Sequence, residues 1–143
     1  MKAITITQPW ASLIALGEKQ FETRGWSTSH RGKIAIHAGK KVNEEAFEDF
    51  KAIFRKHGIT SAKELLTGAV IATANLVECH KVTSEDYEQA MAVTTGPKIS
   101  GQEYRLGDYT PHRYAWEVDG VQHLPKPIPA KGKLSLWEWQ QSI

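Results

Sequence analysis

Alternating apolar and polar residues predict several β-strands along the chain. Residues 2–7, 19–24 and 32–39 alternate with a period of two, as half-buried strands do. Residues 68–82 form a longer run that is rich in β-branched side chains and predict a central strand. Residues 112–121 and 132–140 alternate again, with an Asp-Gly turn after the first of these runs. Strands therefore dominate the predicted structure.

Apolar residues at helical spacing predict a smaller number of helices. A short helix begins at Pro9 and stops before Gly17, and a longer one covers residues 43–58, with Asn43 as its cap. The Ser-x-x-Glu pattern at residue 61 predicts a short helix over residues 61–66, and Ser84 is suited to cap another. Glycine, proline and threonine make residues 91–111 a predicted loop.

The order of these elements predicts an α+β fold. Helices interrupt the strands at irregular intervals, without repeated β-α-β units, which favours a small, mostly antiparallel β-barrel or curled sheet with helices at its ends. A chain of 143 residues, 41% of them hydrophobic, is long enough for one core and short for two. We therefore expect a single domain over residues 1–143.

Composition narrows the class of protein without identifying a partner. The net charge of +2 permits an anionic ligand but does not require one. A single cysteine, Cys79, excludes an internal disulfide and any multi-cysteine zinc site, which is typical of a cytoplasmic protein. No apolar run has the length of a membrane span, so no membrane partner is expected. Neither a nucleotide-cofactor motif nor a metal-ligand pairing of histidines occurs, so we predict no cofactor and no metal.

The densest charge lies in the sequence GEKQFETRGW at residues 17–26. On a strand, Glu22 and Arg24 share one face, where the carboxylate can orient the guanidinium, and Lys19 lies at the strand entrance. Trp26 continues that face and offers a stacking surface. These residues suit a small anionic or polar ligand. The alternative is a solvated strand with a surface ion pair worth about 0–1 kcal/mol.

Three further groups of residues are candidates for ligand contacts. Gln8, Pro9 and Trp10 begin a helix, where free N–H groups favour a phosphate, although Pro9 and Trp10 also suit a purely structural role. Basic residues that include Arg31, Lys40 and Lys41 suit a phosphate backbone or a solvated surface. The predicted late loop interleaves aromatic and cationic residues, among them Tyr109 and Arg113, which suits single-stranded nucleic acid or simple turn packing.

The segment GEKQFETR fits the Gly-x-Lys-x-x-Glu-x-Arg signature of the ASCH family. The flanking segments QPWA and RGKIAIHAGK strengthen the match. GAVIATANLVEC and KGKLSLWEW resemble the central and last strands of that family, so the resemblance extends over nearly the whole chain. It implies a PUA-like β-barrel with a cleft lined by Lys19, Glu22 and Arg24.

The resemblance also implies a function and two alternatives. It places Gln8, Pro9 and Trp10 at the cleft rim and implies binding of RNA or other nucleic acid. Some relatives are ribonucleases, or amidohydrolases on acetylated cytidine such as N4-acetylcytidine. In the small amidohydrolases, a lysine matching Lys19 works with a threonine and a distant glutamate. Here Glu22 replaces that threonine.

We therefore predict a protein that binds RNA, another single-stranded nucleic acid, or a nucleoside or nucleotide in this cleft. The first alternative is a hydrolase in which Lys19 is a general base or electrostatic stabiliser and Glu22 is its partner. The second is a protein-interaction module. The sequence leaves the oligomeric state open.

Overall fold

The computed structural model describes residues 1–140, and this part of the chain divides into two compact units. Unit 1 comprises Met1–Glu18, Lys33–Ala74 and the residues from Gly120 onward, whereas unit 2 comprises Lys19–Gly32 and Asn75–Asp119. Two long strands, β4 (Ala69–Asp86) and β7 (Tyr114–Pro129), contribute residues to both units. The single domain that the sequence predicts over residues 1–143 stays a prediction.

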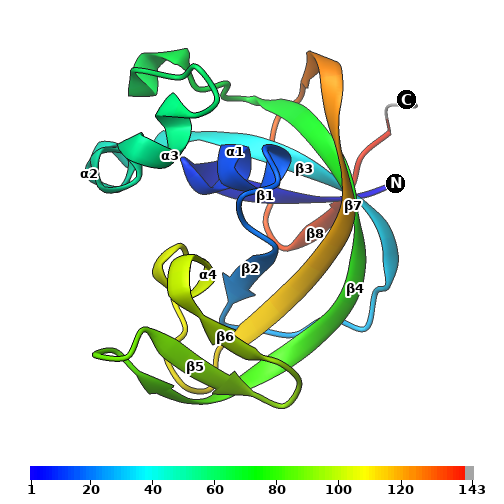
Figure 1. The fold of residues 1–143 in the computed structure, drawn as a ribbon. Helices are drawn as coiled ribbons and strands as arrows, with labels where there is room; N and C mark the ends of the chain where they lie inside the picture. Colours follow the sequence, from blue (N-terminus) through cyan, green and yellow to red (C-terminus); the bar gives the residue numbers. More distant parts are fainter. Residues whose placement is uncertain (141–143) are drawn as a thin grey trace. The chain divides into compact units, whose positions relative to one another are not determined.

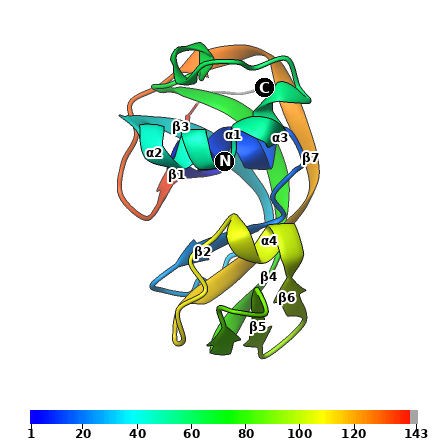
Figure 2. The same cartoon turned by 60° about the vertical axis from the view of Figure 1, so that its left-hand side comes forward.

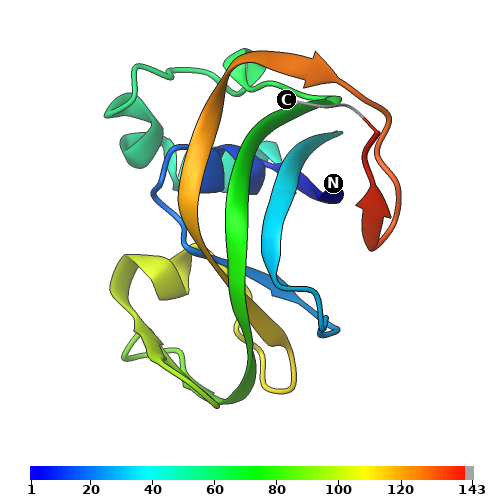
Figure 3. The same ribbon diagram turned by 90° about the vertical axis from the view of Figure 1, so that its right-hand side faces the viewer.

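Unit 1 is built on three predicted strands. β1 (Lys2–Gln8) pairs in parallel with β3 (Gly32–Val42) and antiparallel with β8 (Leu136–Glu138). Figure 1 shows the short helix α1 (Trp10–Ala15) beside β1, and Figure 3 shows β3 next to β4. Apolar side chains of these strands form one buried cluster, which contains Ala3, Ala35, Val70, Leu124, Trp137 and Trp139.

The predicted helix over residues 43–58 is two short helices. They are α2 (Glu44–Asp49) and α3 (Lys51–Arg55), because Phe50 has a φ of −107° that interrupts the first helix. Asn43 caps α2 as predicted, since its side chain accepts a hydrogen bond from the Ala46 N–H at 2.9 Å. The rings of Phe47 and Phe54 stack with centroids 4.9 Å apart. The expected helix at residues 61–66 is only a 3-10 turn, η1 (Ala62–Glu64).

Unit 2 contains a hairpin-rich sheet and one helix. The short strand β2 (Phe21–Arg24) pairs antiparallel with β7, and β4 pairs with β5 (Met91–Thr94), which pairs with β6 (Lys98–Ser100). The helix α4 (Gly101–Arg105) follows β6 directly, and Figure 2 shows the two together. Their core cluster consists of Phe21, Val82, Ala90, Ala92, Ile99, Tyr104, Tyr109 and Ala115.

Three local predictions are wrong in this part of the chain. Ser84 does not cap a helix, because it lies in β4 and pairs with Val93. The predicted loop at residues 91–111 contains β5, β6 and α4, since its apolar residues pack into the core despite the glycine and proline around them. The Asp119-Gly120 pair is not a turn, because β7 continues through Gly120 at a φ of +57°.

The α+β class with mostly antiparallel strands is confirmed. Among the described strands the pairing order is β2-β7-β4-β3-β1-β8, with β5 and β6 attached through β4. The ends of this order, β2 and β8, are not paired with each other, so the strands form an open sheet rather than a closed barrel. No helix within residues 1–140 is long and apolar enough to cross a membrane.

Candidate functional site

Lys19 is a buried cation at the entrance of β2. Its side chain is 2% exposed, and its Nζ donates a hydrogen bond to the main-chain carbonyl of Phe21. Burial lowers the pKa of Lys19, while the negative charges of Glu22 and Glu103 oppose this effect. A buried ammonium group is costly unless polar partners surround it. Lys19 therefore occupies a polar site built within unit 2.

Glu22 and Arg24 form the predicted pair on one face of β2. The Arg24 guanidinium lies 2.9 Å from the Glu22 carboxylate, and the two side chains are only 22% and 13% exposed. The antiparallel register places Glu22 opposite Trp116 and Arg24 opposite Tyr114 of β7. A carboxylate at this distance fixes the orientation of the planar guanidinium. The pair is thus more ordered than an ordinary surface ion pair.

Glu103 is a site residue that the sequence analysis missed. It lies on α4, and its carboxylate accepts hydrogen bonds from the N–H groups of Gln20, at 2.8 Å, and Phe21, at 3.3 Å. Burial raises the pKa of Glu103, although these hydrogen bonds and the charge of Lys19 act in the opposite direction. The contacts join segments far apart in the sequence, and nothing local to Glu103 indicated them.

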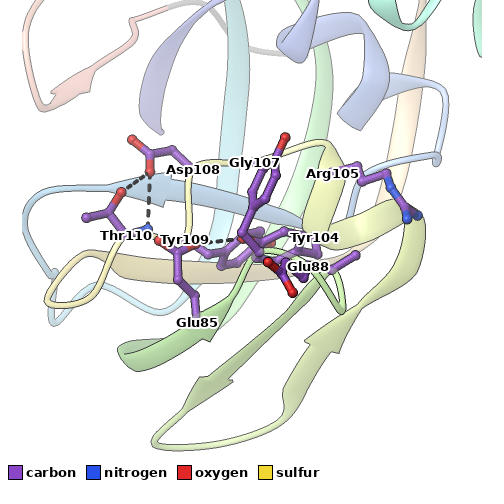
Figure 4. Close-up of a pocket in the computed structure, with 10 residues that line it drawn as sticks. Glu85, Glu88, Tyr104, Arg105, Gly107, Asp108, Tyr109 and Thr110 are labelled. Carbon is purple, nitrogen blue, oxygen red and sulfur yellow. Dashed lines mark hydrogen bonds between the residues drawn. The ribbon is translucent and has the colours of Figure 1, made fainter.

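A pocket of about 790 Å³ lies in unit 2, lined by residues of β4, α4 and the segments that follow them (Figure 4). Gly107 lines it, and a Cβ atom on Gly107 would lie 3.2 Å from Lys19 Nζ. The ammonium group therefore lies directly behind the pocket wall. Asp108 accepts hydrogen bonds from the N–H and hydroxyl of Thr110, as Figure 4 shows. The remaining residues that line the pocket are Glu85, Tyr87, Glu88, Ala90, Tyr104, Arg105 and Tyr109.

Tyr109 and Arg113 are engaged within unit 2. Tyr109 is 1% exposed, and its ring stacks on Tyr104 with centroids 5.8 Å apart, so it does not present the open stacking face that the sequence predicted. Arg113 donates hydrogen bonds to the carbonyls of Thr23, at 3.1 Å, and Asp108, at 3.2 Å. Both residues therefore hold the chain around β2 in place.

Burial also changes the acidity of the two stacked tyrosines. It raises the pKa of Tyr104 to about 12, assisted by the 2.8 Å hydrogen bond that its hydroxyl donates to Glu85. Burial also raises the pKa of Tyr109, and the negative charges of Glu103 and Glu22 add to this effect. Within residues 1–140 the Tyr109 hydroxyl has no hydrogen-bond partner, so it is an unused donor near the two carboxylates.

Trp26 and Arg31 make contacts close to the β2–β3 connection. The Trp26 ring meets Trp116 edge to face at 4.8 Å, and its carbonyl accepts a hydrogen bond from the Trp116 indole. Arg31 forms an ion pair with Glu78 and donates hydrogen bonds to the carbonyls of Thr28 and His30. The Arg31 charge is thus already partly neutralised by the protein.

Comparison with known proteins identifies the family. The model of the ASCH domain matches residues 4–127. The chain belongs to the ASCH domain family. It is 23% identical to activating signal cointegrator 1 of mouse and of human over 98% of its own length, and it spans only 22% of the length of those two proteins.

A solved structure agrees with the fold of this ASCH chain. The crystal structure of ASCH from Zymomonas mobilis has a TM-score of 0.56 and 19% sequence identity, covering 97% of this chain and 87% of that one. At this identity the likeness shows the fold alone. It supports the small α+β architecture that the strand pattern predicts.

The remaining predicted site residues of the ASCH chain lie in unit 1. Gln8 is fully buried, and its amide bonds to Ser12 and to the Leu66 carbonyl, so its hydrogen-bonding groups are used internally. Pro9 follows it through a cis peptide bond, and Trp10 begins α1. Their place at the rim of the cleft stays a prediction. Lys40 and Lys41 are exposed at the end of β3.

The described residues offer no metal centre. Within residues 1–140 no group of three or more histidine, cysteine, aspartate or glutamate side chains is arranged to hold a metal ion. Cys79 lies half-buried in β4 with a free thiol, and burial raises its pKa. A raised pKa disfavours the reactive thiolate form of Cys79.

Proposed function

We propose that this ASCH chain binds RNA, or a nucleotide within it, through Lys19, Glu22 and Arg24. The observation that carries the proposal is the buried Lys19 ammonium, kept in unit 2 beside two carboxylates and behind Gly107 at the pocket wall. A buried charge with a perturbed pKa next to a pocket is typical of a functional site.

Each side chain has a defined role in this proposal. Arg24, oriented by Glu22 at 2.9 Å, contacts a phosphate or a base carbonyl with its planar guanidinium. Glu22 has a second carboxylate oxygen that can accept a hydrogen bond from a base amino group. Lys19 supplies positive charge from a buried position, where water screens its attraction for a phosphate only weakly.

A hydrolase is the second candidate, and the burial of Lys19 is the observation that favours it. Burial lowers the pKa of Lys19, which increases the fraction of neutral amine that can act as a general base. Either Glu22 or Glu103, whose pKa is raised by burial, would be its proton-transfer partner. The substrate would be a modified nucleoside such as N4-acetylcytidine, or an RNA phosphodiester.

The binding proposal is tested by fluorescence anisotropy with short single-stranded RNA and matched DNA. Lys19→Met removes the charge but keeps most of the side-chain volume, which matters because Lys19 is buried. We expect the Lys19→Met protein to bind RNA at least about 10-fold more weakly. Lys63→Met is the matched control, since Lys63 is exposed in η1 of unit 1, and its affinity should equal that of the wild type.

The same proteins separate the two candidate functions. Hydrolysis of N4-acetylcytidine, followed by chromatography, should be absent in the wild type if the site only binds RNA. If the wild type hydrolyses N4-acetylcytidine and Lys19→Met abolishes turnover without a matching loss of affinity, the hydrolase proposal is supported over the binding proposal. Equal RNA affinity and equal turnover in the wild type and Lys19→Met, at equal melting temperatures, would contradict both roles of Lys19.

A further inference from the structure

Unit 1 contains a groove of about 530 Å³, and the charged residues that line it are all basic. It runs between the end of β3 and the segment at residues 130–134 that precedes β8. Four lysines lie along it, two from each segment, and no aspartate or glutamate does. Its lining comprises Thr5, Thr7, His37, Gly39, Lys40, Lys41, Gly68, Ala130, Lys131, Gly132, Lys133 and Leu134.

Three glycines bring the backbone close together along the groove. A Cβ atom on Gly132 would lie 2.7 Å from Thr5 Oγ1 and 2.8 Å from His37 Cε1, so no larger residue fits without displacement. One on Gly39 would lie 3.2 Å from the Thr5 methyl group, and Gly68 has a φ of +66°. Glycine at position 132 therefore lets the 130–134 segment pack directly against Thr5 of β1 and His37 of β3.

A buried hydrogen-bond chain holds the 130–134 segment against the sheet. The Trp137 indole donates to Thr5 Oγ1 at 3.1 Å, and Thr5 Oγ1 lies 3.1 Å from His37 Nδ1. His37 Nε2 lies 2.7 Å from the Ala130 carbonyl, to which it donates. In addition, the Ala130 N–H donates to the Gly68 carbonyl at 3.1 Å. The groove therefore has a fixed backbone.

The four lysines stand apart from the paired cations elsewhere in unit 1. In the part of the chain that the structure describes, Lys2 pairs with Glu138, Lys51 with Glu48 and Lys56 with Glu18. Lys40, Lys41, Lys131 and Lys133 form no ion pair within residues 1–140. Like charges gathered without counter-charges repel one another, and a bound anion removes that repulsion.

The distribution of charge between the units agrees with this reading. Unit 1 carries 11 lysines and arginines against 7 aspartates and glutamates, whereas unit 2 carries 7 against 9. The formal charges are thus +4 and −2. The pocket of unit 2 has the opposite character, since Glu85, Glu88 and Asp108 line it with a single arginine, Arg105. A phosphate backbone is favoured at unit 1.

We propose that the groove of unit 1 binds consecutive phosphates of an RNA backbone, with Lys131 and Lys133 acting together with Lys40 and Lys41. The inference rests on the proposed function and adds a backbone-binding tract to it. The lysines contact phosphates as point charges, and the fixed backbone beneath them holds the two lysine pairs on either side of the groove. Leu134, 93% exposed at the end of the groove, provides an apolar surface for a ribose or base.

The test compares two variants with the same net charge. The groove variant replaces Lys40, Lys41, Lys131 and Lys133 with glutamine. The control variant replaces four other lysines of unit 1, namely Lys51, Lys56, Lys63 and Lys126. Anisotropy with single-stranded RNA is measured between 50 and 200 mM salt, roughly the range over which phosphate contacts weaken. The slope of the logarithm of the association constant against log salt is negative, and the groove variant should make it less steep by about 3, since each of its four lost contacts contributes about 0.7. The control variant should leave the slope unchanged.

A second measurement identifies the source of the phosphates. Inorganic tripolyphosphate is titrated into the wild type, and the amide resonances of Gly39, Gly68 and Gly132 should shift, but not in the groove variant. Equal RNA binding by the groove and control variants, with loss in Lys19→Met, would overturn this inference and leave the proposed function intact. Tripolyphosphate shifts without any RNA binding would support a phosphate site but overturn RNA as its ligand, together with the proposed function. Neither RNA binding nor shifts would overturn both.

Discussion

At the scale of single residues, the unusual feature is a buried lysine that has no carboxylate within ion-pair distance among residues 1–140. Lys19 is 2% exposed and donates to the Phe21 carbonyl, while Glu22 and Glu103 act on it through their charge. Burial dominates, so the folded state favours the neutral amine more than the unfolded state does. The charged form of Lys19 therefore costs stability.

The pH dependence of stability follows from this shift. The pKa of Lys19 is lowered from its ordinary value of 10.5, so between the lowered value and 10.5 the unfolded state binds more protons. The free energy of unfolding should therefore rise with pH in that window, by up to about 1.4 kcal/mol per pH unit. The free energies of unfolding of the wild type and Lys19→Met are measured by urea denaturation at each pH. Their difference cancels the contributions of the tyrosines, which are the same in both proteins. Parallel curves for the two proteins would show that burial does not lower this pKa.

Glu103 should contribute to stability through the main chain of the strand entrance. Glu103→Ala leaves the N–H groups of Gln20 and Phe21 without their acceptor, and we expect a loss of about 1–2 kcal/mol in urea denaturation. Glu88→Ala is the control, because Glu88 is exposed in the same unit, and its effect should stay within about 0.5 kcal/mol. Equal effects of the two substitutions would mean that the Glu103 hydrogen bonds are replaced by water.

At the scale of elements, the four-residue strand β2 is positioned by the segment from α4 to β7. Glu103 of α4 binds its first N–H groups, whereas Arg113 donates to the Thr23 carbonyl and the Asp108 N–H donates to the Thr23 hydroxyl. A strand this short has little stability from its own ladder. The geometry of Glu22 and Arg24 therefore depends on the connection that follows α4.

Gly107 is the position in that connection where added volume is least tolerated. A Cβ atom there would lie 2.8 Å from Tyr109 Cε2 and 3.2 Å from Lys19 Nζ, so Gly107→Ala must displace one of them. We expect a loss of about 1–3 kcal/mol by urea denaturation, together with weaker RNA binding. Gly25→Ala is the matched control, since the added Cβ would lie 4.0 Å from the Arg113 guanidinium, an ordinary van der Waals contact. If Gly107→Ala is as stable as Gly25→Ala, the stacked tyrosines are more adaptable than their packing indicates.

At the scale of the whole molecule, the sequence predicted the parts that depend on local pattern. Strand β1, the cap at Asn43 and the Glu22–Arg24 pair follow from periodicity and side-chain chemistry close in sequence. The structure of residues 91–111 was not predicted, because glycine and proline there lie in tight hairpins. The apolar residues of these hairpins pack on distant strands. Glu103 and the lysines at 131 and 133 gain their surroundings only from contacts between distant segments.

The opposite charges of the two units make a prediction about RNA recognition by the chain as a whole. If binding responds only to the overall field, a charge reversal anywhere should act alike, whereas direct contacts make position decisive. Asp119→Lys in unit 2 raises the net charge by two, and Lys131→Glu in unit 1 lowers it by two.

The contact model gives these two substitutions different salt dependences. Asp119 lines neither the groove nor the pocket. Fields beyond a Debye length, about 8 Å at physiological salt, are largely screened, so Asp119→Lys should strengthen RNA binding only at low salt. Lys131→Glu should weaken it at both low and physiological salt, because it places a carboxylate where a phosphate would bind. Anisotropy titrations at two salt concentrations distinguish binding by the overall field from binding by direct contacts. If the two substitutions have equal and opposite effects, and both effects disappear at physiological salt, the groove lysines act only through the net charge.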